Sequence, residues 1–341
     1  MAIQDVQVTI DVQNPAPKIG LGRPLILAAS TETESIYKEY SELDTLKQDF
    51  PESTSVYKKA AAVFAQTNRP DIVAVATYSA SGGGEPGTGL TIVQALEKYF
   101  DRSWHFLLLP DAISSERLAV SNALQARKFK FLVLKIEDKA EIDQYKLNSR
   151  TILYYHPDKP DEEIDAAIVG DAASLTVGSI TWKFRKNLSG VTPIDISAGE
   201  LKSLHSSGAN AYVLKAGTPQ TSEGLTASGS YIDFIHGQDW VKANIESGLQ
   251  QMLSDNDKVP SNDTGIAMAV SVVTTVLSVA AQNGIIDKDE NGNAEFTVFS
   301  KTMNEIPAED REKRIYSGLS FEYYPEGAFH EMKVKGTVVN Y

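Results

Sequence analysis

The chain has 341 residues with 45 acidic and 32 basic side chains, a formal net charge of −13, and no cysteine. A chain of about this length forms roughly two domains, and a hydrophobic fraction of 42% is enough to build a folded core. The acidic balance argues against a general nucleic-acid or anionic-membrane binder. The lack of cysteine excludes disulfides, thiolate metal sites and cysteine nucleophiles.

The first segment, 1–22, predicts an extended N-terminal arm. Its apolar residues alternate with polar ones, which is typical of a β-strand with one buried face, until two prolines near 15–17 end the pattern. The segment has no basic stretch followed by an apolar one, so we expect no secretion signal. The apolar residues of this arm are Val6, Val8, Ile10 and Val12.

Residues 23–216 predict an α/β domain. Continuous apolar strands that alternate with helices indicate a largely parallel sheet with flanking helices on both faces. We expect Pro51 to divide the helical segment 33–65 into two helices. The expected strands are 24–28, 71–78, 104–110, 129–136, 151–156 and 211–215, and the other expected helices are 89–100, 114–127, 139–146, 161–175 and 197–206.

Residues 217–326 predict a mixed α+β part. A Gly/Ser/Thr-rich loop or edge hairpin at 217–230 is followed by helices at 239–253 and 265–283, then by strands at 295–299 and 319–323. The charge-free apolar run 266–281 is shorter than the roughly 20 residues that span a bilayer, so it predicts a core helix and no membrane insertion.

The last segment, 327–341, predicts a second extended β-arm. Met332, Val334 and Val338 fall on one face of an extended chain, and charged or polar residues fall on the other. A strand at the end of a chain either pairs within its own sheet or is offered to another molecule. Both readings stay open at this point.

A glycine-rich loop at 82–89 suggests nucleotide binding. Gly82, Gly84 and Gly87 satisfy G-x-G-x-x-G after a strand and before a helix, where a pyrophosphate would meet the helix N-terminus. Pro86 stands where the helix should open, and no lysine follows Gly87, which excludes a Walker A loop. A surface loop without a ligand is the alternative.

No other motif predicts a reaction or a cofactor. The run 287–293 matches the first half of a calcium loop, but its twelfth position falls on Val298, so a turn into a strand is expected. The five histidines form no catalytic spacing. We therefore expect no enzyme, metal or cofactor. Arg311, Lys313 and Arg314 form a basic cluster that is either a solvated face or a salt-bridging contact.

Several short motifs, in their order along the chain, resemble the contractile tail sheath proteins of bacteriophages and related injection particles. The resemblance covers about 180–341 and the first 30 residues, and it is only architectural over 30–180. The segments that carry it are 24–27, 190–193, 204–212, 229–242 with G-x-Y-I-D and G-x-D-W, 258–266, 283–286, 310–314 and 327–330.

The resemblance implies a structural subunit of a virion tail, assembled in the bacterial host cytoplasm. Such subunits stack as six-fold rings around a tail tube and contract to drive the tube into the host envelope, which leads to genome injection. The implied partners are other copies of the chain, the tail tube protein, and baseplate and terminator proteins, with no direct nucleic-acid contact. It also implies that 23–216 is the outer part, 217–326 lies next to the tube, and both arms add strands to neighbours.

Two other functions remain open from the sequence. One is an α/β nucleotide-binding enzyme that uses the 82–89 loop, and the other is a different self-assembling tail component such as a tube or baseplate protein.

Overall fold

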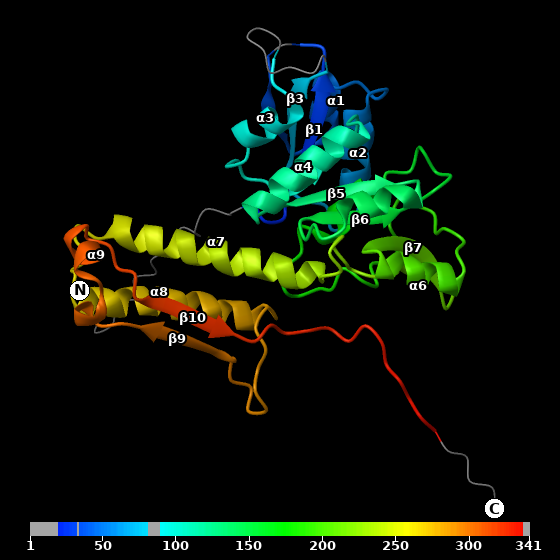
Figure 1. Ribbon diagram of the computed structural model, residues 1–341. Helices are drawn as coiled ribbons and strands as arrows, with labels where there is room; N and C mark the ends of the chain where they lie inside the picture. Colours follow the sequence, from blue (N-terminus) through cyan, green and yellow to red (C-terminus); the bar gives the residue numbers. More distant parts are fainter. Residues whose placement is uncertain (1–19, 33, 81–88, 337–341) are drawn as a thin grey trace, which may run out of the picture.

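The computed structural model describes residues 20–32, 34–80 and 89–336. Its α/β body is built on a sheet whose eight described strands lie in the order β2-β3-β1-β4-β5-β6-β7-β8 (Figure 1). The neighbours from β3 to β7 run parallel, and β2 and β8 add antiparallel edges. This confirms the predicted, largely parallel sheet. The strands are β1 Pro24–Ser30, β2 Tyr37–Tyr40, β3 Val73–Ser79, β4 Phe106–Leu108, β5 Phe131–Ile136, β6 Thr151–Tyr155, β7 Ala209–Lys215 and β8 Thr218–Thr221.

Helices cover both faces of this sheet because its strands are apolar on both sides. Along β1, Leu25 and Leu27 belong to one core, whereas Ile26 and Ala28 belong to the other. The first core is covered by α3 Ile92–Lys98, α4 Ser114–Arg127, the 3₁₀ helix η1 Lys139–Tyr145 and α6 Ala198–Ser206. The second is covered by α1 Leu43–Asp49, α2 Ser55–Phe64, α5 Ile164–Ala172 and the start of α7 Ile232–Asp255.

The chain between 33 and 65 differs in part from the sequence prediction. Pro51 does separate two helices, but Tyr37–Tyr40 is a strand that pairs antiparallel with β3, Tyr37 opposite Ala76 and Tyr40 opposite Val73. The helical prediction there was wrong, because pairing at the sheet edge outweighs a helical spacing that covers only a few residues.

The C-terminal unit extends away from the sheet (Figure 1). It consists of α7, which begins seven residues before the expected start, the antiparallel α8 Asp263–Gln282, and a hairpin of β9 Phe296–Ser300 and β10 Leu319–Tyr323. A short 3₁₀ helix η2 Met303–Glu305 and α9 Ala308–Glu312 connect the two strands. The two long helices and one face of the hairpin enclose a core of their own, around Val241, Val273, Leu277 and Ile286.

Within the described ranges, α8 alone is long and apolar enough to cross a membrane by length and composition. It packs along α7 and against β9, and 33% of its most apolar window is buried. The predicted helix at 265–283 is therefore present, as one of the two helices under the hairpin.

The described part of the last segment, 327–336, contains neither helix nor strand. It leaves the molecule as an extended tail that runs away from the C-terminal unit (Figure 1). The side chains of this tail are mostly exposed. Pairing of 327–336 within its own sheet, one of the two readings left open by the sequence, is not found.

Candidate assembly site

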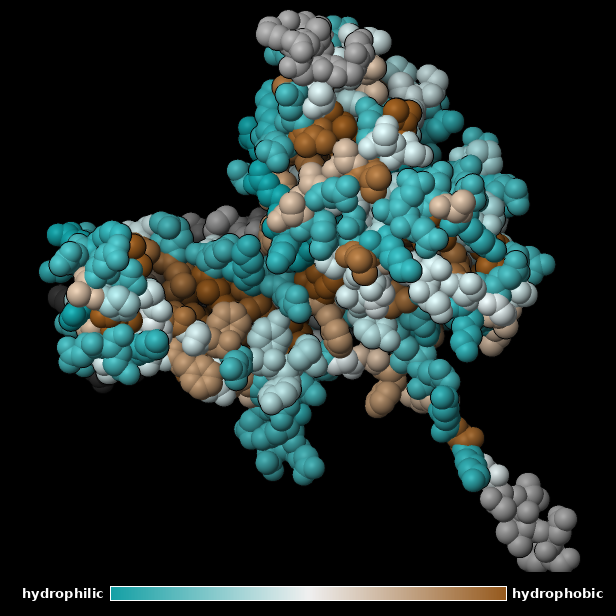
Figure 2. Space-filling model, in the orientation of Figure 1, coloured by the Kyte–Doolittle hydropathy of each residue, from teal (hydrophilic) through white to brown (hydrophobic). Residues whose placement is uncertain are grey.

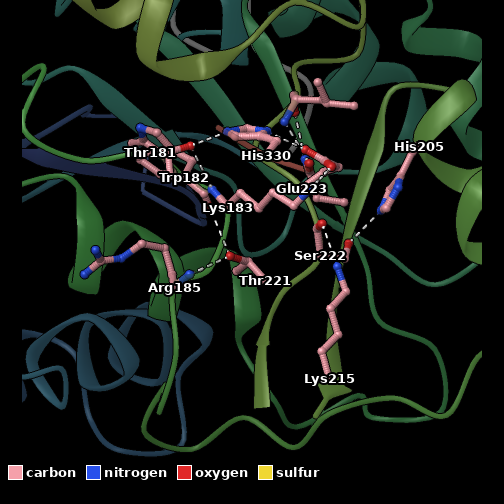
Figure 3. A network of polar contacts seen from close by, with 12 residues as sticks. Thr181, Trp182, Lys183, Arg185, His205, Lys215, Thr221, Ser222, Glu223 and His330 are labelled. Atoms are coloured by element: carbon pink, nitrogen blue, oxygen red, sulfur yellow. Dashed lines mark hydrogen bonds and ion pairs between the residues drawn. The ribbon is translucent and has the colours of Figure 1, made fainter. Parts of the chain in front are cut away.

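A polar clamp holds the start of the tail against the α/β body (Figure 3). The imidazole of His330 lies 2.8 Å from Thr181 Oγ1 through Nε2 and 2.9 Å from Glu223 Oε2 through Nδ1. The rings of Tyr231 and Phe184 meet this imidazole edge-on, with centroids 4.9 and 6.1 Å away. Four contacts on one side chain fix the point where the tail leaves the body.

Glu223 is the centre of this clamp. Its other carboxylate oxygen, Oε1, accepts a hydrogen bond from Lys183 Nζ. Burial alone would raise the pKa of Glu223, but Lys183 and His330 hold this pKa below its usual value. The carboxylate is therefore ionised at neutral pH, and it links three segments of the chain around 183, 223 and 330.

Beyond the clamp the tail offers apolar side chains to the outside. Met332 is 76% exposed and Val334 is 93% exposed, while Phe329, just before the clamp, is 82% exposed. Exposed apolar side chains at alternating positions are unusual on a free surface and favour a partner strand. Val338 and the N-terminal arm residues Val6, Val8, Ile10 and Val12 lie outside the described residues.

The hairpin of β9 and β10 provides edges that another strand could join. Within the described residues these two strands form a sheet of their own, so each has one unpaired edge. One face packs on the helices through Val298, Leu319 and Phe321, while Thr297 and Glu322 point outward. A two-stranded sheet is marginal by itself and is stabilised by further strands.

An apolar groove lies beside β10. It has a volume of about 450 Å³ and runs between α7, α8 and the hairpin, where hydrophobic surface is visible along α7 (Figure 2). Its lining includes Leu249 and Met252 from α7, Ile266 from α8 and Phe321 from β10. A strand added to this edge would have apolar surface beneath alternate side chains.

The structure separates the three basic residues that the sequence grouped together. Arg311 and Arg314 line the apolar groove. Lys313 instead pairs with Glu309 one helical turn earlier, at 2.5 Å, on an exposed surface. Arg311 and Arg314 thus place positive charge at the rim of the groove.

A buried ionic cluster joins α7 to the sheet. Asp239 Oδ2 accepts a hydrogen bond from Arg150 Nη1 at 2.5 Å and lies 3.0 Å from His105 Nε2. The rings of His105 and His236 stack with centroids 5.2 Å apart, and His236 Nε2 lies 2.9 Å from the carbonyl of Leu21. Burial lowers the pKa of His105, and it lowers that of His236 to about 3. Both imidazoles are therefore neutral at pH 7.

The remaining sequence motifs carry no site in the described residues. Gly82, Gly84 and Gly87 lie outside them. Asp289 accepts hydrogen bonds from the backbone N–H groups of Asn291 and Asn293, which is the predicted turn. His156 is buried and bonds to Glu162 at 2.8 Å, as expected for a core histidine. No cluster of three or more metal-binding side chains occurs in the described parts of the chain.

Sequence reasoning missed Glu223 as the partner of His330, Lys183 as the partner of Glu223, and Arg150 as the partner of Asp239. The separations are 107 residues for His330 and Glu223 and 89 for Arg150 and Asp239, so no local pattern links these residues. Some signal was present, because His330 and Asp239 both lie inside the motifs that carry the sheath resemblance.

Known proteins that are similar to this chain include tail sheath proteins. Residues 232–301 match the family described as E217 tail sheath protein gp31-like, C-terminal domain. No curated protein matches the chain in sequence. A chain of the anti-feeding prophage baseplate is similar over 99% of both chains, with a TM-score of 0.72 and 15% identity.

Two further solved structures show the same fold. The sheath complex of an extracellular contractile injection system, PVC, in its contracted state has a TM-score of 0.72 at 12% identity, and the alignment covers 99% of this chain and 98% of that one. A sheath tail protein of Listeria innocua has a TM-score of 0.57 at 9% identity over 89% of this chain and 94% of that one. The whole chain therefore has the fold of sheath proteins.

Proposed function

We propose that this chain is a subunit of the contractile tail sheath family, which polymerises around a tail tube and contracts to drive that tube into a host envelope. The family match over 232–301 and the sheath fold of the whole chain support this function, and they do not favour a nucleotide-binding enzyme. The observation that carries the proposal is the tail: it leaves the body at His330 with its apolar residues exposed, next to a hairpin with unpaired edges.

Assembly would proceed by strand addition between copies. The tail of one copy adds to the open edge of β10 or β9 in another copy, and Met332 and Val334 fall toward the apolar groove on alternate positions. We propose the same role for Val338 and for the N-terminal residues Val6, Val8, Ile10 and Val12. A contact that joins a tail to a different surface is heterologous, so it closes into a ring where the rotation between copies allows this and otherwise extends as an open array.

The other partners follow from the same proposal. The matched structures include baseplate as well as sheath complexes, which supports self-association and contact with a baseplate. We propose that Arg311 and Arg314 meet acidic side chains of the tail tube protein, because they supply positive charge at the rim of the groove. We propose that Lys313 joins this contact with the tube once its ion pair with Glu309 is broken. A terminator protein would cover the last ring.

Contraction would need no chemical reaction in the subunit. We propose a structural, non-enzymatic protein in which two packings of the same folded copy differ in free energy, and the difference is set during assembly. Its location would be the tail of a virion or related particle after assembly in the host cytoplasm. We also propose that the C-terminal sheath domain begins near 232 rather than 217, because β8 pairs with β7 in the body sheet.

A shortened chain that ends at His330 tests this function. It keeps the clamp but loses the apolar tail, so we expect a folded, soluble subunit that no longer forms the rods that the full chain forms by electron microscopy. Exchanging Lys333 for Ala in the full chain is the control, since this side chain is 89% exposed and stands between the apolar residues Met332 and Val334 in the sequence. A full chain that stays monomeric, or a shortened chain that still forms rods, would count against the proposal.

A further inference from the structure

A second surface of the molecule has the features of a binding site. A pocket of about 490 Å³ lies where the end of α4 and the start of β4 meet α7. Four cationic side chains line it, Arg102, Arg127, Lys130 and Lys242, against the two acidic residues Asp101 and Glu246. The whole chain has a net charge of −13, so this pocket, with more basic than acidic side chains, differs in charge from the rest of the molecule.

Lys130 forms the inner wall of this pocket. Its side chain is almost fully buried at 3% exposure, and its Nζ lies 3.8 Å from the centre of the Trp104 ring. The ammonium donates one hydrogen bond, to the carbonyl of Arg102 at 2.8 Å, and no carboxylate of the described chain lies within ion-pair distance of it. The backbone of Lys130 is left-handed, with φ of 67°. A carboxylate that enters beside this buried amine favours its charged form.

The other cations of the pocket can also receive an anion. Arg102 is exposed and forms no ion pair in the described parts of the chain, although its guanidinium stacks on Tyr37. Arg127 pairs with Glu97 at 3.2 Å, and Lys242 lies 3.9 Å from Glu246 on exposed helix surface. Exposed pairs of this kind contribute little and exchange partners easily. The pocket therefore has positive charge that an outside carboxylate could neutralise.

An acidic loop on the same chain supplies matching chemistry. The loop 287–295 between α8 and β9 contains Asp287, Asp289, Glu290 and Glu295 against one lysine, and none of the four carboxylates forms an ion pair in the described chain. The loop has a defined conformation. The carboxylate of Asp289 accepts a backbone hydrogen bond within the turn, and the backbones of Lys288 and Ala294 form an antiparallel β-bridge. Glu290 is exposed at its tip. An ordered loop loses little conformational entropy when it binds.

The pocket and the loop lie on opposite sides of the C-terminal unit. The end of α4 meets α7 from one side, while the loop between α8 and β9 projects from the other (Figure 1). One copy therefore cannot fill its own pocket with its own loop. A contact between two different surfaces of identical copies is heterologous, so it builds a closed ring or an open polymer according to the rotation between the copies.

We propose that the pocket around Lys130 and Arg102 receives the acidic loop 287–295 of a neighbouring copy, with Glu290 as the carboxylate that enters it. This contact rests on the proposed function, since it needs a homopolymer, but it is distinct from strand addition by the tail. It gives the array a polar contact that depends on salt, beside an apolar one that does not.

A charge swap tests the contact. Arg102→Glu and Glu290→Arg, each alone, should raise the lowest protein concentration that assembles, measured by sedimentation, about tenfold or more. The double variant, which restores opposite charges, should return to within about threefold of the unaltered chain. Lys202→Glu and Glu32→Arg are matched controls, because both residues are exposed and lie outside the pocket and the loop.

Two further measurements test whether the variants fold and whether the pocket binds a small anion instead of a protein loop. Circular dichroism and thermal unfolding of each monomer verify the fold, and Arg102→Gln replaces Arg102→Glu if the latter does not fold. Normal assembly of the single variants overturns this contact and leaves the proposed function intact. A double variant that stays impaired overturns the pairing of these two residues. Binding of inorganic phosphate to the monomer that Arg102→Gln abolishes, measured by calorimetry before assembly, would show a small-anion site and overturn the proposal. An unaltered chain that never assembles overturns the proposed function.

Discussion

Asp239 on α7 is bonded to Arg150, the residue directly before β6, with 2.5 Å between Oδ2 and Nη1 and both side chains buried. Burial alone would raise the pKa of Asp239, but His105 and Arg150 keep this pKa below its usual value. This ion pair is a polar link between the C-terminal unit and the sheet. It couples the part that carries the hairpin to the rigid body of the molecule.

Removing the carboxylate of this pair should destabilise the fold. Asp239→Ala leaves the guanidinium of Arg150 buried without its partner, and breaking a buried pair in this way costs about 3–5 kcal/mol of unfolding free energy. Urea denaturation measures the change. Glu246→Ala on the exposed face of the same helix is the control, expected within about 0.5 kcal/mol of the unaltered chain. A loss below about 1 kcal/mol for Asp239→Ala would contradict this account.

The stacked imidazoles predict acid sensitivity. The pKa of His236 in the fold is about 3, below the unfolded value near 6.5, so the folded state binds fewer protons than the unfolded one in this range. The stability is therefore present above about pH 6.5 and is lost as the pH falls toward 3. His236→Phe should flatten the slope of unfolding free energy between pH 6.5 and 4.5 by up to about 1.4 kcal/mol per pH unit. An unchanged slope would argue against a neutral, buried His236.

The buried Lys130 predicts a change of stability with pH in the alkaline range. Burial lowers the pKa of its ammonium to about 7, and Asp101 offsets this only in part. Between pH 7 and 9 the unfolded chain holds a proton that the folded chain releases, so stability rises with pH there. Lys130→Met should remove this rise, as measured by urea unfolding of the monomer at several pH values. Lys128→Met, at an exposed neighbouring position, should leave the rise intact.

The clamp at His330 predicts local release of the tail without global unfolding. His330→Ala removes the contacts to Thr181 and Glu223, so limited proteolysis should cut more rapidly near 327–332 while the melting temperature changes little. Glu331→Ala, at an exposed position, is the control. Equal cleavage rates in the two variants would show that the clamp does not hold the tail.

The sequence predicted the parts of the fold that local pattern determines. The apolar runs of β1, β3, β5 and β6 and the helix at 114–127 are where periodicity placed them, because each has enough residues to show its period. The four-residue β2 was missed, since its identity depends on pairing with β3.

The candidate site was predictable only in its exposed half. The alternation of Met332 and Val334 is visible in the sequence, and so is the basic run near 311–314. Lys183, Glu223 and His330 meet only after the sheet has brought three distant segments together. Arg311 and Arg314 line the groove whereas Lys313 does not, and this difference depends on the three-dimensional fold, so the sequence alone does not show it.

The tail leaves the body at one place and the open strand edge lies at another, which has a consequence for any open array of these molecules. Every copy inside it gives a tail and receives one, but the copies at its two ends cannot do both. One end presents unfilled edges and the other presents unplaced tails, so the array has a direction and its ends differ chemically. Growth, capping and the start of a structural change can each be confined to one end, without any difference in sequence between the copies.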